Sequence, residues 1–194
     1  MKNVVTISRQ MGSGGRSAAD YLSAQLGWPV VGKEIVTEAA AKKGIDPSKI
    51  ERIFEHRITL QDRVTFQQKS AKYLAAIKDA IHEYAEKGDV ILLGRGAHII
   101  LGDNPDVFRV YLNAEFDVRM MRIAEKHDLK GKKGLEEARR MVVESDYARA
   151  SYHNYLFGVD SFDPLLYDLG LNTTWMSAQQ AGDAILAVFE LVRG

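Results

Sequence analysis

The stretch of residues 4–17 reads VVTISRQMGSGGRS and joins three local patterns that together decide the fold. Its first four residues are apolar or β-branched, which favours a short buried strand. The glycines at positions 12, 14 and 15 favour a tight turn, and residues 17–26 carry apolar side chains at helical spacing. A strand, a glycine turn and a helix in this order direct free backbone N–H groups and the positive helix end at one point. We therefore predict an anion site at the turn.

The turn partly matches the phosphate-loop pattern G-x-x-x-x-G-K-[ST], aligned on residues 10–17. Gln10 replaces the first glycine, and Arg16 replaces the lysine but keeps its positive charge in another shape. Gly15 keeps the glycine that allows close approach, and Ser17 keeps the hydroxyl that would bind Mg²⁺. An ordinary tight turn is the alternative interpretation. The predicted nucleotide-binding residues are Gly12, Ser13, Gly14, Gly15, Arg16 and Ser17, with Ser17 as the metal ligand.

Strands and helices alternate along the rest of the chain. Continuous apolar runs at residues 89–93 and 107–112 predict central strands covered on both faces, and residues 28–31 and 167–172 predict two shorter strands. The helical segments are residues 33–87, 114–127 and 135–155, and a last helix opened by a capping box of Ser177 and Gln180. Within the first segment, Asp46 is an N-cap and Pro47 takes the first helical position. A Lys/Gly-rich break at 129–134 precedes the third segment. This alternation predicts a three-layer α/β fold with a parallel sheet.

Composition limits the classes of function. The 194 residues suit one domain, and 26 Lys and Arg balance 26 Asp and Glu, so we expect neither polymeric nucleic acid nor a membrane as a partner. The lack of cysteine excludes disulfides, thiolate metal sites and cysteine nucleophiles. No apolar stretch has the length of a secretory core or a membrane span, so we expect a cytoplasmic protein. The five histidines lack the spacing of a metal site and are interpreted as structural.

Several arginines are candidates for binding or catalysis. Arg95 lies between Gly94 and Gly96 directly after a predicted central strand, at the sheet edge where open α/β folds bind ligands. The alternative interpretation of Arg95 is a surface salt bridge. The helical arginines lie among carboxylates, which is typical of a solvated face. Phosphoryl transfer, however, also needs several arginines to stabilise the developing charge. The helix after the Lys/Gly break is a candidate lid. These arginines are Arg119, Arg122, Arg139, Arg140 and Arg149.

Taken together, these segments resemble the cytidylate kinase-like family, a branch of the nucleoside monophosphate kinases with a P-loop fold. The carriers of the resemblance are residues 7–16, Gly32 to Ile35, Leu93 to Gly96, Tyr167 to Leu169 and Leu171 to Thr173. The resemblance implies a single domain over residues 1–194, with a core of residues 1–34 and 88–194 that holds ATP, a helical monophosphate-binding insertion at about 35–87 and a lid at about 125–155. It also implies that Arg95 holds the acceptor phosphate and that Arg140 and Arg149 are lid arginines.

The sequence thus predicts an ATP-dependent kinase that phosphorylates a nucleoside monophosphate, with CMP as one candidate acceptor. ATP and Mg²⁺ are the expected cofactors, and the predicted catalytic arginines are Arg16, Arg95, Arg140 and Arg149. Gly32 and Gly96 stand where related chains commonly carry aspartate, which keeps open a nucleotide-binding sensor or degraded kinase without turnover. A plain α/β binding module is a third hypothesis. The sequence does not indicate an oligomeric state.

Overall fold

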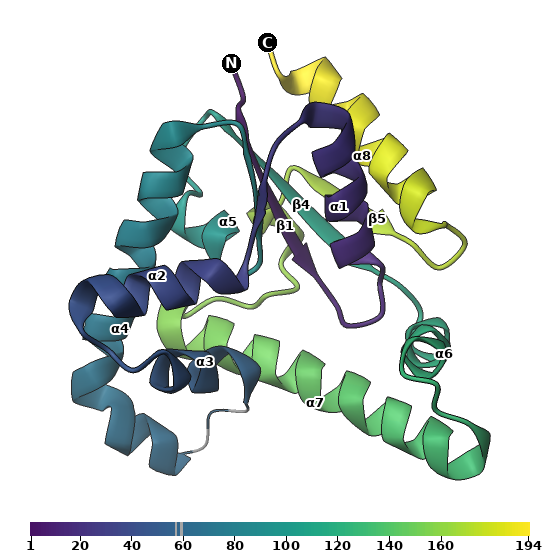
Figure 1. Cartoon of the computed structure of the whole chain (residues 1–194), viewed down its shortest axis with the longest axis horizontal. Helices are drawn as coiled ribbons and strands as arrows, with labels where there is room; N and C mark the ends of the chain where they lie inside the picture. Colours follow the sequence, from purple (N-terminus) through teal and green to yellow (C-terminus); the bar gives the residue numbers. More distant parts are fainter. Residues whose placement is uncertain (57, 59) are drawn as a thin grey trace.

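The computed structural model describes residues 1–56, 58 and 60–194, with the backbone alone over residues 60–70. Its centre is a five-stranded sheet in the order β2-β3-β1-β4-β5, and every neighbouring pair is parallel (Figure 1). The strands are β1 (Val4–Arg9), β2 (Val30–Val31), β3 (Val90–Leu93), β4 (Val107–Asn113) and β5 (Leu169–Asn172). The predicted parallel sheet with helices around it is confirmed.

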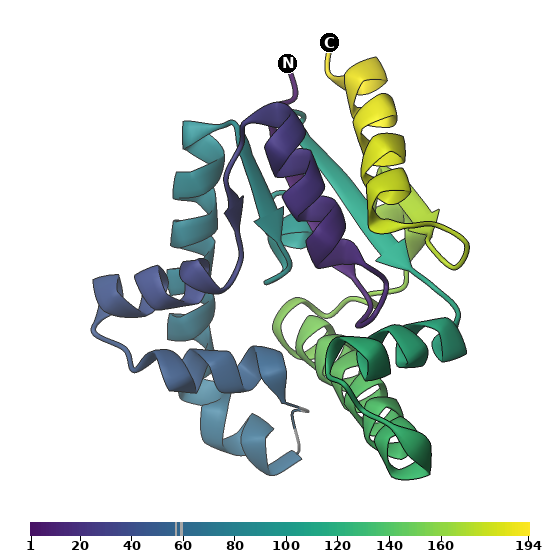
Figure 2. The same ribbon diagram turned by 45° about the vertical axis from the view of Figure 1, so that its right-hand side comes forward.

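Side chains along β1 alternate between the two faces of the sheet, and each face is covered by its own apolar core. Val5 and Ile7 face one side, where they pack with α1 (Gly15–Leu26) and α8 (Ala178–Val192). Val4 faces the other side and belongs to a second apolar cluster. Figure 2 shows α1 and α8 side by side on the same face. Because both faces of the strand are covered, all of its residues from Val4 to Ser8 are buried, including the polar Thr6 and Ser8.

The second face is covered by the helices that follow β2 and β3. They are α2 (Lys33–Lys43), α3 (Pro47–Glu55), α4 (Leu60–Lys87) and α5 (Ala97–Ile100). Asp46 accepts a hydrogen bond from the Ser48 N–H and Pro47 opens α3, as predicted. The short helix α5 is not predicted from the sequence. The proposed insertion at 35–87 covers most of α2 and all of α3 and α4, but its residues 57 and 59 lie outside the described part of the chain. The division into core, insertion and lid stays a prediction.

Two helices, α6 (Phe116–Lys126) and α7 (Gly131–Phe157), pack against each other, and Figure 1 shows α7 running below the carboxyl ends of the central strands. Helix α7 begins four residues earlier than the sequence predicts. Gly134 lies inside its first turns, and a side chain there would place Cβ 2.6 Å from the carbonyl carbon of Leu129. The predicted Lys/Gly-rich break is therefore a short connection whose second glycine allows a close contact.

The last part of the chain contains the predicted capping box and a strand that is shorter than predicted. A 3₁₀ turn (Pro164–Leu166) precedes β5, which shortens the predicted strand at its start. Ser177 and Gln180 form both hydrogen bonds of the capping box that opens α8. Within the described residues, we find no helix with the length and apolar character needed to cross a bilayer.

Candidate functional site

The glycine turn connects the carboxyl end of β1 to the first turn of α1. Gly12 and Gly14 both have φ of 79°, in the left-handed region that favours glycine. A Cβ at Gly12 would lie 2.5 Å from the backbone oxygen of Arg119, so this position also requires glycine for close packing. In the described part of the chain, four consecutive backbone N–H groups at the turn have no acceptor, those of Gly14, Gly15, Arg16 and Ser17. Free amides at a helix N-terminus form a site for phosphate.

Two arginines of α6 hold this turn in place. The Arg119 side chain is buried and donates to the Met11 carbonyl (3.2 Å), the Ala114 carbonyl (3.0 Å) and Asp146 of α7 (2.7 Å). Arg122 donates to the Gly12 carbonyl (3.4 Å) and to carbonyls of the loop after β5. These two arginines therefore support the loop through their hydrogen bonds, and a role for them in phosphoryl transfer stays a prediction.

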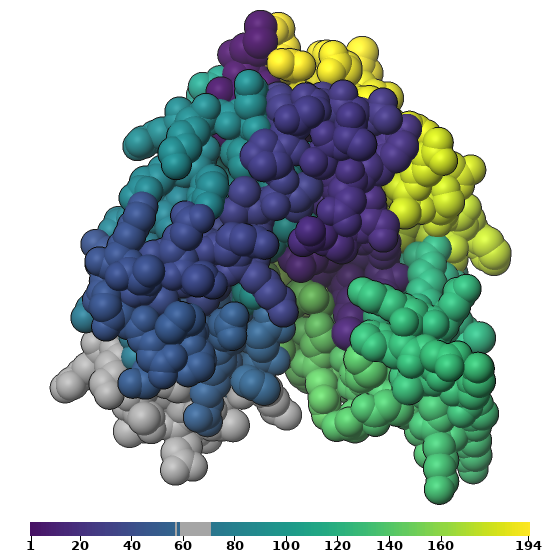
Figure 3. Space-filling model, viewed as in Figure 1, coloured from purple at the N-terminus to yellow at the C-terminus, as the bar shows by residue number. Residues whose placement is uncertain are grey.

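A cavity of about 380 Å³ opens beside the turn. Figure 3 shows the hollow between the blue helices α2 and α3 and the green helices, with the purple N-terminal segment above it. Among the described residues, its walls carry five cationic side chains and two carboxylates: Arg9, Arg16, Lys33, Arg95 and Arg149, with Glu34 and Glu55. Such an excess of positive charge suits a ligand that carries several negative charges.

Arg95 and Arg149, two of the predicted site residues, both line this cavity. Arg95 is buried, donates to Glu55 at 2.9 Å and lies over the Phe54 ring at 5.0 Å. Its backbone φ of 59° is unusual for a residue other than glycine. Arg149 comes from α7 and is held by Asp146 at 3.7 Å, and its Nη1 is buried without a hydrogen-bond partner in the described part of the chain. Both arginines therefore line the cavity, Arg95 from the loop after β3 and Arg149 from α7.

The other two predicted catalytic arginines differ in position. Arg16 lines the cavity, but its side chain is 58% exposed and its Nε pairs with Asp20 one turn along α1 at 3.0 Å. Arg140 is not among the described residues that line the cavity; it is exposed and pairs with Glu137 and Glu144 on α7. The predicted lid role of Arg140 has no support from this arrangement and stays a prediction.

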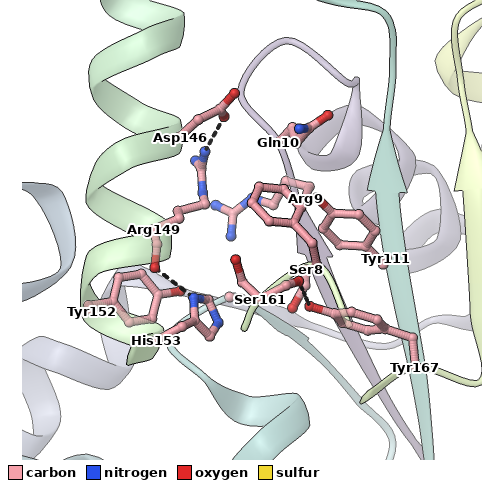
Figure 4. Close-up of a pocket in the computed structure, with 12 residues that line it drawn as sticks. Ser8, Arg9, Gln10, Tyr111, Asp146, Arg149, Tyr152, His153, Ser161 and Tyr167 are labelled. Carbon is pink, nitrogen blue, oxygen red and sulfur yellow. Dashed lines mark hydrogen bonds and ion pairs between the residues drawn. The ribbon is translucent and has the colours of Figure 1, made fainter. Parts of the chain in front are cut away.

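A second, much smaller cavity of about 20 Å³, with room for about one water, lies next to the first (Figure 4). Beside it, His98 is buried, with Nδ1 2.9 Å from Ser8 Oγ and Nε2 3.2 Å from Tyr167 Oη. Tyr167 gives its one hydroxyl proton to the Ser161 carbonyl at 2.9 Å. His98 must then donate from Nε2 and accept from Ser8 at Nδ1, which is the neutral imidazole. The structural interpretation of this histidine fits that network.

Burial keeps two histidines of this region neutral. Desolvation lowers the pKa of His98 to about 3, with a further contribution from nearby His153, and desolvation lowers the pKa of His153 to about 4. A histidine in the unfolded chain has a pKa of about 6.5. Below pH 6.5 the unfolded chain therefore binds more protons than the folded protein, so stability falls as the pH falls.

We expect the free energy of unfolding to decrease between pH 6.5 and 5 by roughly 1.4 kcal/mol per pH unit for each of these histidines. Urea unfolding across this range measures the slope. His153→Leu should lower the slope by about one histidine's share. An unchanged slope in His153→Leu would show that His153 is protonated in the folded protein.

Sequence reasoning missed several residues that line the main cavity, above all Arg9, Lys33 and Glu55. Arg9 ends β1 and Lys33 begins α2, so both positions follow from the element boundaries. The carboxyl ends of parallel strands meet at one edge, and that rule would have selected Arg9 together with Arg95. Glu55 has no comparable signal, because its place depends on how α3 packs.

The fit of a metal can be judged from the donor atoms. Ser17 is exposed on the first turn of α1, beside the free amides. No cluster of three or more His, Cys, Asp or Glu side chains suited to a metal occurs in the part of the chain that the structure describes. Mg²⁺ commonly binds through few protein oxygens, with water and substrate phosphates as the other ligands. One serine hydroxyl at a phosphate loop fits that coordination.

Comparisons with known proteins agree with this geometry. A family model described as the cytidylate kinase-like family matches residues 4–175. A protein named cytidylate kinase from Methanopyrus kandleri is 28% identical over 196 residues, which cover 96% of this chain and 93% of that protein. A solved structure of an uncharacterised protein from Eubacterium ventriosum has a TM-score of 0.74 at 22% identity, covering 97% of this chain and 99% of the other. Shikimate kinase from Bacteroides thetaiotaomicron shares the fold with a TM-score of 0.53 at 15% identity, over 98% of both chains.

Proposed function

We propose that this chain, which belongs to the cytidylate kinase-like family, is an ATP-dependent kinase that transfers a phosphoryl group to a nucleoside monophosphate, with CMP as the first acceptor to test. One observation carries this proposal. Arginines of β1, β3 and α7 converge on a single cavity at the carboxyl edge of the sheet, and the glycine turn with its free amides lies beside that cavity, which Arg16 lines. Phosphoryl transfer depends on this kind of positioning and charge neutralisation, because little covalent chemistry is left to the protein.

The donor side of the site is the glycine turn with the loop that follows β5. Thr173 donates from its hydroxyl to the Ser13 carbonyl at 2.8 Å, which joins that loop to the turn. Trp175, in the same loop, is 90% exposed. We infer that the ATP phosphates bind to the turn amides and that the base lies near this indole. Ser17 would hold Mg²⁺, which neutralises phosphate charge and orients the donor.

The acceptor side is the wall formed by α2, α3 and the loop after β3. Arg95 is positioned there by Glu55 and Phe54, so its guanidinium can hold an acceptor phosphate without reordering its side chain. Arg149 reaches the cavity from α7 and would stabilise charge that develops on the transferred group. An in-line transfer between the two walls needs no covalent intermediate.

A coupled phosphotransfer assay over a panel of nucleoside monophosphates tests the function. We expect turnover with at least one pyrimidine monophosphate and Mg·ATP. Mg·ATP should also stabilise the folded protein, by about 2.7 kcal/mol at a hundredfold excess over the dissociation constant. Fluorescence of exposed Trp175 gives an independent titration, since the other tryptophan, Trp28, is buried.

The alternatives predict different results in the same experiments. A sensor or degraded kinase would bind Mg·ATP but show no turnover with any acceptor. A plain α/β module with a structural turn would give neither a thermal shift nor a fluorescence change at millimolar nucleotide. That last outcome would refute nucleotide binding altogether.

A further inference from the structure

Arg9 lies at the centre of the site, although the phosphate-loop pattern does not include it. It is the last residue of β1, and its side chain passes between the glycine turn and the loop after β3. A Cβ at Gly15 would lie 2.7 Å from Arg9 Cβ and 2.8 Å from its Cγ, and a Cβ at Gly94 would collide with its Nη1. Two glycines from different loops therefore leave the space that this one arginine occupies.

The charge of Arg9 has no counter-ion within the described residues. No hydrogen bond or ion pair involves its guanidinium there, whereas Arg16 pairs with Asp20 and Arg95 with Glu55. The groups that face Arg9 are mostly cationic or neutral. Arg149, Arg95 and Tyr152 lie near it, together with the carboxylate of Glu55. Desolvation, followed by repulsion from Arg149, lowers the pKa of Arg9 to about 10.

A half-buried cation without a partner is unfavourable in the folded protein unless a ligand supplies the opposite charge. Arg9 lines both the 380 Å³ cavity and the small cavity beside it, so it lies where the two meet. Figure 4 shows the guanidinium group of Arg9 close to the side chain of Arg149, whose own guanidinium group is turned toward Asp146. Phosphate oxygens placed beside the Arg9 guanidinium would satisfy its planar N–H donors.

We propose that Arg9, and not Arg16, is the cation that binds the donor's terminal phosphate where it meets the acceptor, in place of the lysine of the common phosphate loop. This inference rests on the proposed kinase function. Arg16 is less suited to the task because its side chain is 58% exposed and already paired along its own helix. Arg9 instead reaches across the turn toward Gly94, next to Arg95.

The test compares Arg9→Met with the matched variant Arg16→Met, using tripolyphosphate and Mg·ADP as probes in calorimetric titrations. We expect Arg9→Met to weaken tripolyphosphate binding by roughly 10- to 100-fold, as for the loss of charge-assisted hydrogen bonds. Arg16→Met should weaken it by less than about threefold, as for the loss of an exposed charge. Arg9→Lys keeps the charge without the planar fork and should restore part of the affinity.

Thermal stability without any anion separates a binding role from a structural one. If Arg9 is an unpaired cation that waits for a ligand, Arg9→Met should melt at the same temperature as the wild type or higher, and should lose most of the tripolyphosphate-induced shift. A lower melting temperature with an unchanged shift would mean that Arg9 supports the fold and would overturn the proposal. Equal losses of affinity in Arg9→Met and Arg16→Met would overturn it as well.

These outcomes stay distinct from failure of the proposed function. If the wild type turns over ATP and Arg9→Met keeps wild-type affinity and rate, the role of Arg9 is refuted while the kinase stands. If no acceptor supports turnover but Arg9→Met loses tripolyphosphate binding, the kinase is refuted while Arg9 remains the phosphate ligand.

Discussion

Replacing Arg149 with alanine is expected to lower kcat by roughly 10³-fold or more while the affinity for Mg·ATP stays close to that of the wild type. Arg149 projects from α7 into the cavity with a buried Nη1 that has no hydrogen-bond partner in the described part of the chain. An arginine that meets charge mainly in the transition state contributes to the rate and little to ground-state binding. Steady-state kinetics beside equilibrium ATP titration measures both quantities.

Arg139→Ala is the matched control for this experiment. Arg139 lies on the same helix, is exposed and stacks over Phe116 at 5.3 Å, away from the cavity. Its loss should change neither kcat nor ATP affinity beyond about 0.5 kcal/mol. Arg140→Ala tests the lid role that the family resemblance implies for that residue. If Arg149→Ala keeps the wild-type kcat, Arg149 is not part of the catalytic machinery.

Much of the fold follows from local sequence. The mostly apolar runs of residues predict β1, β3 and β4, and the capping residues predict where α3 and α8 begin. At these elements the local sequence and the structure agree. The exceptions are elements whose stability comes from tertiary contacts. Helix α5 has only four residues, too few for a periodic pattern. Helix α7 starts at Gly131 and includes Gly134, which packs tightly on Leu129, whereas a glycine in sequence indicates a break more often than such a contact.

The candidate site could be predicted in part. Its glycine turn and Arg95 are next to strand ends, and a strand end fixes the position of the residues that follow it. Arg119 and Arg122 could not be assigned, since their partners are backbone carbonyls far away in the sequence. For the cation that binds phosphate, the motif position selects Arg16, whereas we propose Arg9. The ion pair between Arg16 and Asp20, on which this difference depends, appears only in the structure.

Gly12→Ala is expected to destabilise the protein far more than Gly14→Ala, although both glycines have the same φ of 79°. An alanine in this left-handed conformation costs about 1–2 kcal/mol at either position. At Gly12, the new Cβ would also lie 2.5 Å from the Arg119 backbone oxygen and 2.9 Å from its Cα. At Gly14, no atom lies within 4 Å of the new Cβ. The difference between the variants therefore isolates the steric contact between the turn and α6.

The contact at Gly12 is with backbone, so no side-chain rotation can relieve it. Either the turn or α6 must move, and α6 is fixed by the bonds of Arg119 to the Met11 and Ala114 carbonyls and to Asp146. Such overpacking costs typically 1–3 kcal/mol beyond the dihedral strain, which gives a total loss of about 2–5 kcal/mol for Gly12→Ala. Urea unfolding of both variants measures the difference directly. Equal losses would mean that α6 adjusts freely to the turn, and Arg119 and Arg122 could then not be the residues that hold the phosphate loop in its binding conformation.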